Sequence, residues 1–166
     1  MKRKYAESIE LEGVPNLYKV SSELYRSAQP TEEGFENLDK LGIKTVVSLR
    51  AFHDDINLIV DTDLKYERIC MQTWYPEVED AIKFLRIVSD PKRTPVLVHC
   101  LHGADRAGTM SALYRIVIEG WTKEEAIEEM TEGGFGFHWI WENLTDWIEE
   151  LHINKIKKEL EKSCNT

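Results

Sequence analysis

Segments with the length and pattern of strands alternate with helical segments through the middle of this sequence, and this alternation restricts the fold more than any other feature. Residues 43–49 form a β-branched apolar run, residues 66–71 alternate in polarity, and residues 96–98 are again apolar. Between these segments, apolar residues recur at helical spacing. Strands and helices that alternate in this way form a largely parallel sheet with right-handed crossovers. The sequence therefore predicts an α/β fold, with a mostly parallel four- to five-stranded sheet flanked by helices.

Local signals mark the elements that precede the first of these strands. Residues 17–21 and 23–27 have the pattern of two short strands separated by Ser22, which suggests a tight antiparallel pair or a bent edge strand. Thr31 is a favoured N-cap residue and Gly42 is a favoured terminator, so a helix is expected between them.

Helices are also expected in the C-terminal part of the chain. Thr122 and Glu125 have the spacing of a capping box at a helix start. From Phe137 to Leu151 the apolar residues follow helical spacing, which predicts one long helix that continues toward Leu160. We interpret the tryptophans of this helix as core residues.

Composition limits the class of protein. At 166 residues the chain has the size of one domain that buries a core unaided. The net charge of −9 disfavours a general nucleic-acid binder, although the local field of a pocket can still attract a phosphate-bearing substrate. No apolar run approaches the roughly 20 residues that a membrane-spanning helix needs. A cytoplasmic location is expected by default, and export stays open if a leader has been removed.

The three cysteines, Cys70, Cys100 and Cys164, are widely spaced. They form no CxxC pair and no metal-binding pattern, so neither a disulfide framework nor a metal site is expected. Cys70 is predicted to be a buried strand residue that acts as a small hydrophobe. The alternative for Cys70 is a redox partnership with Cys100.

The segment with the clearest chemistry follows the strand at 96–98. It reads His99-Cys100-Leu101-His102-Gly103-Ala104-Asp105-Arg106. Cys100 therefore lies between a buried strand and a helix N-terminus, where unpaired N–H groups and the helix dipole favour an anion. The same field favours the thiolate over the thiol, so Cys100 is a candidate nucleophile.

Arg106 and Gly103 complete a predicted phosphate cradle. The planar guanidinium of Arg106 matches two phosphate oxygens, and its charge offsets that of a transferring phosphoryl group. Gly103 lets the loop turn with its amides inward, as phosphate-binding nests require. A cysteine and an arginine at this spacing are common by chance, but the strand, the helix and the flanking His and Gly residues make the pattern specific.

This loop resembles the signature of the protein tyrosine phosphatase superfamily, which is His-Cys-x-x-Gly-x-x-Arg-Thr/Ser-Gly. The similarity is greatest to the small atypical dual-specificity branch, in particular its bacterial members and the related plant and fungal group. It extends through residues 24–30, 41–50 and 120–126. We interpret residues 1–166 as a single dual-specificity-phosphatase-like catalytic domain with its core at about 14–151.

The resemblance implies hydrolysis of phosphate monoesters through a cysteinyl-phosphate intermediate, without a metal or another cofactor. Cys100 would attack phosphorus, Arg106 would bind the substrate and the transition state, and water would complete the reaction. One position departs from the family pattern, because the Thr or Ser after the arginine is Ala107 here. In the family this hydroxyl hydrogen-bonds the cysteine sulfur and helps it to leave. Slower breakdown of the phosphoenzyme is therefore expected.

The leaving oxygen also needs a proton. In the family an Asp on a separate loop usually supplies it, but the equivalent segment here, 71–76, contains no Asp. One candidate is Asp105, which resembles the loop aspartate of myotubularin-type and Sac-type lipid phosphatases. The alternative candidates open the following helix, namely Glu77, Glu79 and Asp80. Their simpler interpretation is charge that complements the helix dipole.

Further substrate contacts are expected around the loop, because ligands of open α/β sheets gather beyond the C-terminal ends of the strands. The candidates are Leu101, His102, Gly103, Ala104, Arg50 with His53, and Trp74. His102 is expected to face outward, whereas His99 is expected to support the loop by hydrogen bonds. The open alternative for Arg50 is an ion pair with a nearby acid.

The first functional hypothesis is a protein phosphatase of the tyrosine or dual-specificity type. Inositol phosphates or phosphoinositides are the second substrate class, suggested by Asp105 but weakened because the loop has no Lys. A third hypothesis is a catalytically weak phosphate-binding module, supported by Ala107 alone. A sulfur-transfer or arsenate-reducing enzyme is disfavoured, because no resolving cysteine is evident. The expected partner is a phosphorylated protein or an inositol phosphate, without nucleic acid or a membrane span, and a monomer is expected.

Overall fold

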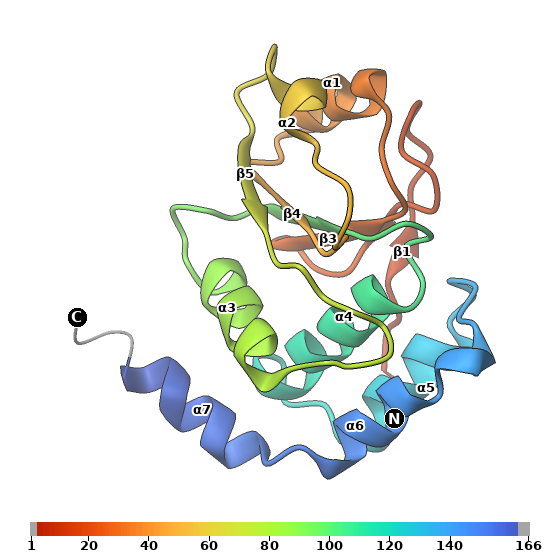
Figure 1. The fold of residues 1–166 in the computed structure, drawn as a ribbon, viewed down its shortest axis with the longest axis vertical. Coiled ribbons are helices and arrows are strands. Elements are labelled where there is room, and N and C mark those ends of the chain that lie inside the picture. The colour runs from red at the N-terminus through yellow and green to blue at the C-terminus, as the bar shows by residue number, and fades with distance from the viewer. Residues whose placement is uncertain (1–2, 163–166) are drawn as a thin grey trace.

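The computed structural model describes residues 3–162, which build a mixed sheet between two helical layers (Figure 1). The sheet is six-stranded in the order β1-β2-β3-β6-β4-β5. Its strands are β1 (Glu7–Ser8), β2 (Tyr18–Lys19), β3 (Leu24–Ser27), β4 (Thr45–Ser48), β5 (Lys65–Arg68) and β6 (Val96–His99). The strands β3, β6, β4 and β5 are parallel, and β1 and β2 extend the sheet in antiparallel pairing. The predicted α/β class is confirmed.

The predicted strand number of four or five is wrong, because the sheet has six strands. The strand that sequence reasoning missed is β1, which is two residues long and exposed. Such a strand is too short to show the alternation of polar and apolar residues by which strands are predicted. The predicted antiparallel pair near the N-terminus is present as β2 and β3, and β3 continues into the parallel part of the sheet.

The helices cover both faces of the sheet, with α1 and α2 on one face and the other helices on the opposite face (Figure 1). They are α1 (Glu32–Leu41), α2 (Ile56–Ile59), α3 (Val78–Val88), α4 (Arg106–Val117), α5 (Lys123–Glu132), α6 (Asn143–Glu150) and α7 (Ile153–Lys162), with a 3₁₀ turn at Trp139–Trp141 before α6. Predicted helix ends are confirmed where capping residues marked them. The Oγ1 of Thr31 accepts from the Gly34 N–H at 3.0 Å, and Thr122 and Glu125 form the expected capping box.

Alternating side chains of the central strands supply two cores. Val46 and Leu97 pack with Phe35 of α1 on one face of the sheet. Their neighbours Val47 and Val98 belong to the larger core on the other face. Successive strand residues point to opposite faces, so strands covered by helices on both sides read as continuous apolar runs. The sheet is thereby fixed from both sides, and the loop that leaves β6 starts from a rigid base.

The prediction of one long final helix is wrong, because α6 ends at Glu150 and α7 begins at Ile153. Leu151 between them has extended backbone, with ψ at 142°. The Nζ of Lys123 donates to the carbonyl oxygens of Glu149 and Leu151, both at 2.7 Å. This amine satisfies carbonyl groups at the end of α6, and the chain turns instead of continuing the helix.

The tryptophans expected in the core contact it without being fully enclosed. Trp141 and Trp147 are partly buried and pack against the larger core, as predicted.

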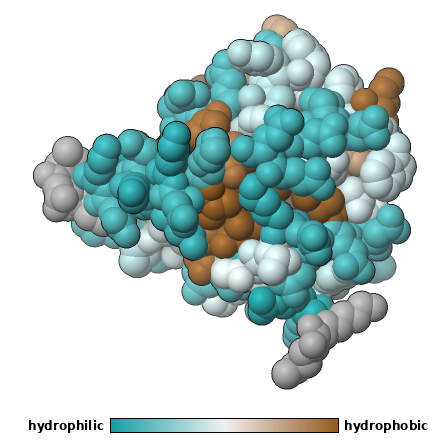
Figure 2. Space-filling model, turned by 90° about the horizontal axis from the view of Figure 1, so that it is seen from below, coloured by the Kyte–Doolittle hydropathy of each residue, from teal (hydrophilic) through white to brown (hydrophobic). Residues whose placement is uncertain are grey.

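A groove of about 330 Å³ lies between the helices α3, α6 and α7, and Trp147, Val78 and Ile156 are among the residues that line it. Figure 2 views the molecule from below Figure 1 and shows an apolar patch within a hydrophilic surface. Among residues 3–162, no helix combines the length and apolarity needed to cross a membrane.

Candidate active site

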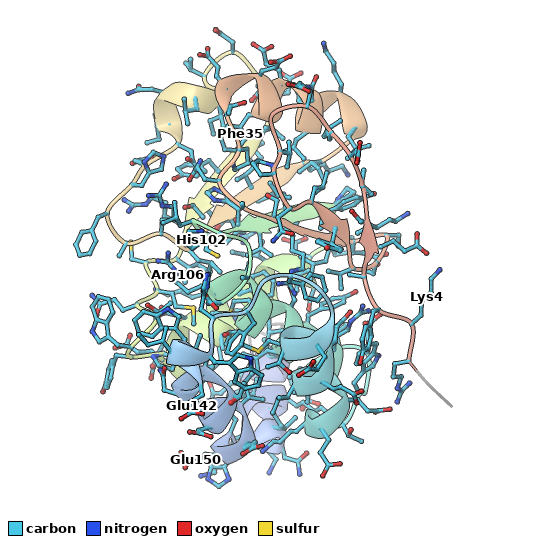
Figure 3. The ribbon with its side chains drawn as sticks, turned by 90° about the vertical axis from the view of Figure 1, so that its right-hand side faces the viewer. Lys4, Phe35, His102, Arg106, Glu142 and Glu150 are labelled. Carbon is cyan, nitrogen blue, oxygen red and sulfur yellow. The ribbon has the colours of Figure 1, made fainter. Side chains whose placement is uncertain are left out.

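The candidate catalytic loop runs from the end of β6 to the first residue of α4, so the strand and the helix that flank it are those expected from the sequence. Cys100 is 2% exposed and lies at the base of this loop. His102 is exposed, as predicted, and Figure 3 shows it on the same side of the molecule as Arg106. The loop therefore joins a buried sulfur to an open surface.

Gly103 is required by the backbone of the loop. Its φ of +75° lies in the left-handed region, which residues with a side chain rarely adopt. A Cβ at this position would lie 2.5 Å from the backbone nitrogen of Ala28 and from the carbonyl carbon of Ser27. The loop is also tied to this segment by the Gln29 N–H, which donates to the Leu101 carbonyl at 3.2 Å. Gly103 thus allows both the turn and the close approach to β3.

Arg26 supports the loop from behind, and sequence reasoning did not single it out. It is 1% exposed, and its Nη2 donates to the carbonyl oxygens of Gly103 at 2.9 Å and Ala104 at 3.4 Å. Its guanidinium also lies 3.7 Å from the centre of the Phe135 ring. Burial lowers the pKa of Arg26 to about 10. The one signal in the sequence is a charged residue within an otherwise buried strand.

The contacts of Arg26 explain how the loop can bind an anion. In a trans peptide the carbonyl oxygen and the next N–H point in opposite directions. When the carbonyl groups of Gly103 and Ala104 turn toward Arg26, the N–H groups of Ala104 and Asp105 turn away from it. Converging N–H groups at a helix N-terminus form an anion-binding nest.

The guanidinium of Arg106 has one hydrogen-bonded nitrogen, Nη1, and one unpaired nitrogen, Nε. Its Nη1 donates to the carbonyl oxygens of Met71 at 3.2 Å and Leu49 at 3.4 Å, which follow β5 and β4. Its Nε is buried without a hydrogen-bond partner in the described residues. An unpaired buried donor is costly, so this nitrogen has a hydrogen bond left to give.

His99 supports the loop through a residue that sequence reasoning missed. Its Nε2 lies 2.6 Å from Asp55 Oδ2, and both side chains are fully buried. Gln29 Nε2 donates to the other oxygen of Asp55 at 2.8 Å. Burial is the largest influence on the Asp55 carboxyl and opposes its ionisation. The hydrogen bonds and electrostatic interactions with His99, Gln29 and His53 together outweigh burial, so the pKa of Asp55 lies below its usual value. His99 is therefore held by a buried hydrogen bond to Asp55, in line with its predicted supporting role.

The structure contradicts one of the two interpretations of Arg50. Its Nη1 donates to Gln29 Oε1 at 3.0 Å, and within residues 3–162 it forms no ion pair with an acid. The acid-pair interpretation is wrong, because Arg50 donates to the amide oxygen of Gln29 instead of to a carboxylate. Gln29 in turn donates to Asp55, which also lies beside His99 and His53. A contact of Arg50 with substrate stays a prediction.

Asp105 is buried, and both of its carboxylate oxygens accept hydrogen bonds from one residue. The backbone N–H of His138 donates to Oδ1 at 2.8 Å, and Nδ1 of the same residue lies 2.7 Å from Oδ2. Asp105 does not cap α4 with its side chain, although it occupies the N-cap position. His138 was not among the predicted residues, since it is separated from the loop by 33 positions.

The alternative acids lie at the start of α3. Glu77 and Glu79 are exposed, and Asp80 is half-buried. Burial and the nearby charge of Glu77 raise the pKa of Asp80 above its usual value. Asp80 therefore keeps its proton to a higher pH than an ordinary Asp, and the hypothesis that it donates a proton stays open.

Exposed apolar side chains occur on the catalytic loop and on the loops that leave the same edge of the sheet after the parallel strands β4 and β5. Leu101 of the loop is 45% exposed and the predicted contact residue Trp74 is 60% exposed. Other exposed large apolar residues belong to the loops that follow β4 and β5 and to the turn before α6, namely Phe52, Tyr75, Trp139 and Ile140. The Asn143 side chain donates to the Thr73 carbonyl at 2.9 Å and joins the second of these loops to α6.

Cys70 is exposed, so its prediction as a buried strand residue is wrong. The strand β5 ends at Arg68, but alternating burial continues, with Ile69 and Met71 inside and Cys70 on the solvent side. Cys164 lies outside the described residues. In residues 3–162, no group of three or more His, Cys, Asp or Glu side chains is arranged to hold a metal ion.

Comparison with known proteins agrees with this geometry. A family model described as a DSP-PTPase phosphatase fused to NAD+ kinase matches residues 15–142. The dual specificity protein phosphatase TpbA of Pseudomonas aeruginosa is 41% identical over 124 residues, which cover 73% of this chain and 56% of that protein. The chain therefore matches little more than half the length of this relative.

The chain is also similar to a solved structure and to a relative with a different substrate. The crystal structure of P. aeruginosa TpbA in complex with pTyr superposes with a TM-score of 0.83 at 30% identity, and the match covers 94% of this chain and 95% of that chain. The inositol diphosphatase DSP5 of Arabidopsis thaliana is 25% identical over 153 residues, 87% of this chain and 73% of that protein.

Proposed function

The chain belongs to the dual-specificity-type phosphatases of the protein tyrosine phosphatase superfamily, and from this premise we propose that it hydrolyses phosphate monoesters through a cysteinyl-phosphate on Cys100. The observation that carries the proposal is the loop itself. Between Cys100 and Arg106 it combines a buried thiol, a helix N-terminus and the unpaired Nε of the arginine. These groups bind the phosphoryl oxygens and supply the nucleophile.

In the first step the Cys100 thiolate attacks phosphorus. The amides of the loop and the guanidinium of Arg106 bind the phosphoryl oxygens and balance their charge in the transition state. Because Arg106 is already held by the Leu49 and Met71 carbonyls, little reorganisation accompanies binding. The P–O bond to the leaving group breaks, and a cysteinyl-phosphate is formed.

In the second step a water molecule attacks phosphorus and the thiolate leaves. Ala107, fully buried at the start of α4, offers no hydroxyl to the departing sulfur. We therefore propose that hydrolysis of the phosphoenzyme is slow relative to its formation. The missing hydroxyl at Ala107 also supports the second candidate function, a weakly catalytic phosphate-binding module. The rate of phosphoenzyme hydrolysis tests this alternative.

For the substrate, we propose a phosphorylated protein segment with apolar residues near the phosphate. The exposed apolar side chains at the mouth, Leu101 and Trp74 among them, suit a phosphotyrosine and its neighbours better than a polyanion. The loop carries no Lys to bind additional phosphates. Inositol phosphates remain the second substrate class, on the ground that one relative is an inositol diphosphatase. We propose that the chain acts as a monomer, since one chain supplies the loop and its supports.

Phosphate release from p-nitrophenyl phosphate without added metal tests the mechanism. We expect Cys100→Ser to abolish activity and Cys70→Ser, the matched exposed cysteine, to retain it. Full activity of Cys100→Ser would overturn the proposal. A panel of phosphotyrosine peptides and inositol polyphosphates then compares kcat/KM between the two substrate classes, and a preference for the inositol compounds would reject the protein substrate.

A further inference from the structure

The loop between α5 and α6 is built against the catalytic loop. The side-chain amide of Asn16 donates to the carbonyl oxygens of His102 at 3.1 Å and Phe135 at 2.9 Å, and so bridges the two loops. Asn16 does this from a left-handed conformation, with φ at 53°. The Phe135 ring lies against the guanidinium of Arg26, which itself holds the Gly103 carbonyl. The segment before α6 is thereby positioned relative to the phosphate site.

This arrangement brings His138 to Asp105. Two hydrogen bonds of 2.8 Å and 2.7 Å join the backbone N–H and Nδ1 of His138 to the two carboxylate oxygens. A carboxylate that accepts from Nδ1 selects the tautomer with hydrogen on Nδ1. The chemistry of the ring is then left to Nε2, for which the described residues offer no hydrogen-bond partner.

The ring of His138 lies at the mouth of the site. Its side chain is 47% exposed, and its ring centre is 5.1 Å from that of His102, two residues beyond Cys100 on the catalytic loop. The titratable side chains in contact with it in the described structure are Asp105 and His102. Because the Cys100 sulfur is buried, a leaving group must depart through the exposed side of the loop, on which His102 lies.

We propose that His138 is the general acid of the first step and that Asp105 positions it. This inference rests on the proposed function. Asp105 balances the charge of the imidazolium and fixes its orientation, which is the division of labour in other carboxylate–imidazole pairs. It explains why segment 71–76 can lack an Asp, and it assigns Asp105 a role as orienting group in place of proton donor.

The proton balance follows from these roles. As the Cys100 sulfur bonds to phosphorus, the P–O bond to the leaving group breaks and the leaving oxygen takes the proton from Nε2 of His138. The neutral Nε2 next accepts a proton from the water that attacks the cysteinyl-phosphate. The S–P bond breaks, and inorganic phosphate and the thiolate are released with His138 protonated again.

The decisive experiment compares leaving groups. We expect His138→Gln to lower kcat/KM for phenyl phosphate and phosphotyrosine by roughly 10²–10⁴-fold, the usual contribution of a general acid. With 2,4-dinitrophenyl phosphate, whose leaving group needs no proton, the loss should be less than about tenfold. His152→Gln is the matched control, because this exposed histidine lies near the groove beside α7.

Asp105→Asn tests the positioning role. It should show the same dependence on the leaving group as His138→Gln, and vanadate inhibition should be retained in both variants because the anion nest is intact. Equal losses of His138→Gln on both kinds of substrate, or none, would overturn the inference. The proposed function is judged separately, since its failure would appear as activity that survives Cys100→Ser.

Discussion

The Nη2 of Arg26 donates to the carbonyl oxygen of Gly103 at 2.9 Å, and this bond joins β3 to the catalytic loop across 77 residues of sequence. It fixes the direction of a peptide group, and so determines that the following N–H faces the phosphate site. The arginine is fully enclosed, and burial lowers its pKa to about 10. The cost of enclosing this charge is offset in part by the carbonyl groups and the Phe135 ring that it contacts.

Arg26→Met should therefore weaken anion binding more than it weakens the fold. Methionine fills much of the same space without the buried charge, but it releases the carbonyl groups of Gly103 and Ala104. We expect the inhibition constant of vanadate to rise at least about tenfold, which corresponds to roughly 1.4 kcal/mol. Arg86→Met, at an arginine on the surface side of α3, is the control. Unchanged vanadate inhibition in Arg26→Met would contradict the supporting role.

Gly103→Ala should lose activity, whereas Gly120→Ala should not. Both glycines have positive φ, at 75° and 76°, so an alanine at either carries a similar backbone penalty of about 1 kcal/mol. Only at Gly103 would the added Cβ collide with the backbone of Ser27 and Ala28, since the space around Gly120 is open. Urea denaturation with kcat/KM measurement separates the two effects. Equal activity of both variants would show that the loop tolerates the displacement.

Sequence reasoning succeeded where the determinants were local. The loop from Cys100 to Arg106 and the helix caps depend on neighbours within a few residues, so their patterns are visible in the chain. The residues that support the loop from distant parts of the sequence could not be predicted in this way. Asp55 meets His99 across 44 positions and His138 meets Asp105 across 33, and no periodicity encodes such pairings.

The two errors have different origins. Cys70 is predicted to be buried because free cysteine behaves as a small hydrophobe, but its side chain lies on the solvent side, between the buried residues Ile69 and Met71. The long final helix follows from apolar spacing alone, whereas the amine of Lys123, 28 residues before Leu151, binds the carbonyls at its break. A tertiary contact that apolar spacing does not reveal therefore lies at the break of the helix.

Asp55→Asn should change how the free energy of unfolding depends on pH in the acid range. The pKa of Asp55 is lowered in the folded state from an ordinary value of 3.8, because the interactions with His99, Gln29 and His53 together outweigh the opposing effect of burial. The unfolded chain therefore binds this proton at higher pH, and the contribution of Asp55 is complete above the ordinary value and is lost as the pH falls. The stability difference between wild type and Asp55→Asn should therefore stay constant from neutral pH down to the region of the ordinary value of 3.8 and shrink as the pH falls below it.

Urea denaturation across this pH range measures that difference, with Asp61→Asn, at an exposed acid, as the control. At neutral pH we expect Asp55→Asn to cost about 1–3 kcal/mol, because its buried hydrogen bonds with His99 and Gln29 are weakened. A difference that is constant with pH would mean that ionisation of Asp55 does not contribute to folding.

Ala107 provides the last prediction, which concerns the second half of the catalytic cycle. The residue is fully buried in the first turn of α4, directly after Arg106, so a hydroxyl introduced here lies next to the catalytic loop. A hydroxyl that donates to the departing sulfur would lower the barrier to hydrolysis of the cysteinyl-phosphate. Ala107→Thr should therefore raise turnover, and Ala107→Ser should do so with less added volume in a packed site.

Rapid-quench kinetics with p-nitrophenyl phosphate resolves the two steps. Wild type should release a burst of p-nitrophenol followed by slower turnover, and the hydroxyl variants should speed the slow phase by about tenfold, as expected for one hydrogen bond of roughly 1.4 kcal/mol. Ala107→Val adds volume similar to that of Thr without a hydroxyl and is the matched control. If Val accelerates the slow phase as much as Thr, packing and not the hydroxyl limits release of Cys100; if neither does, the second step is not limited by the missing hydroxyl.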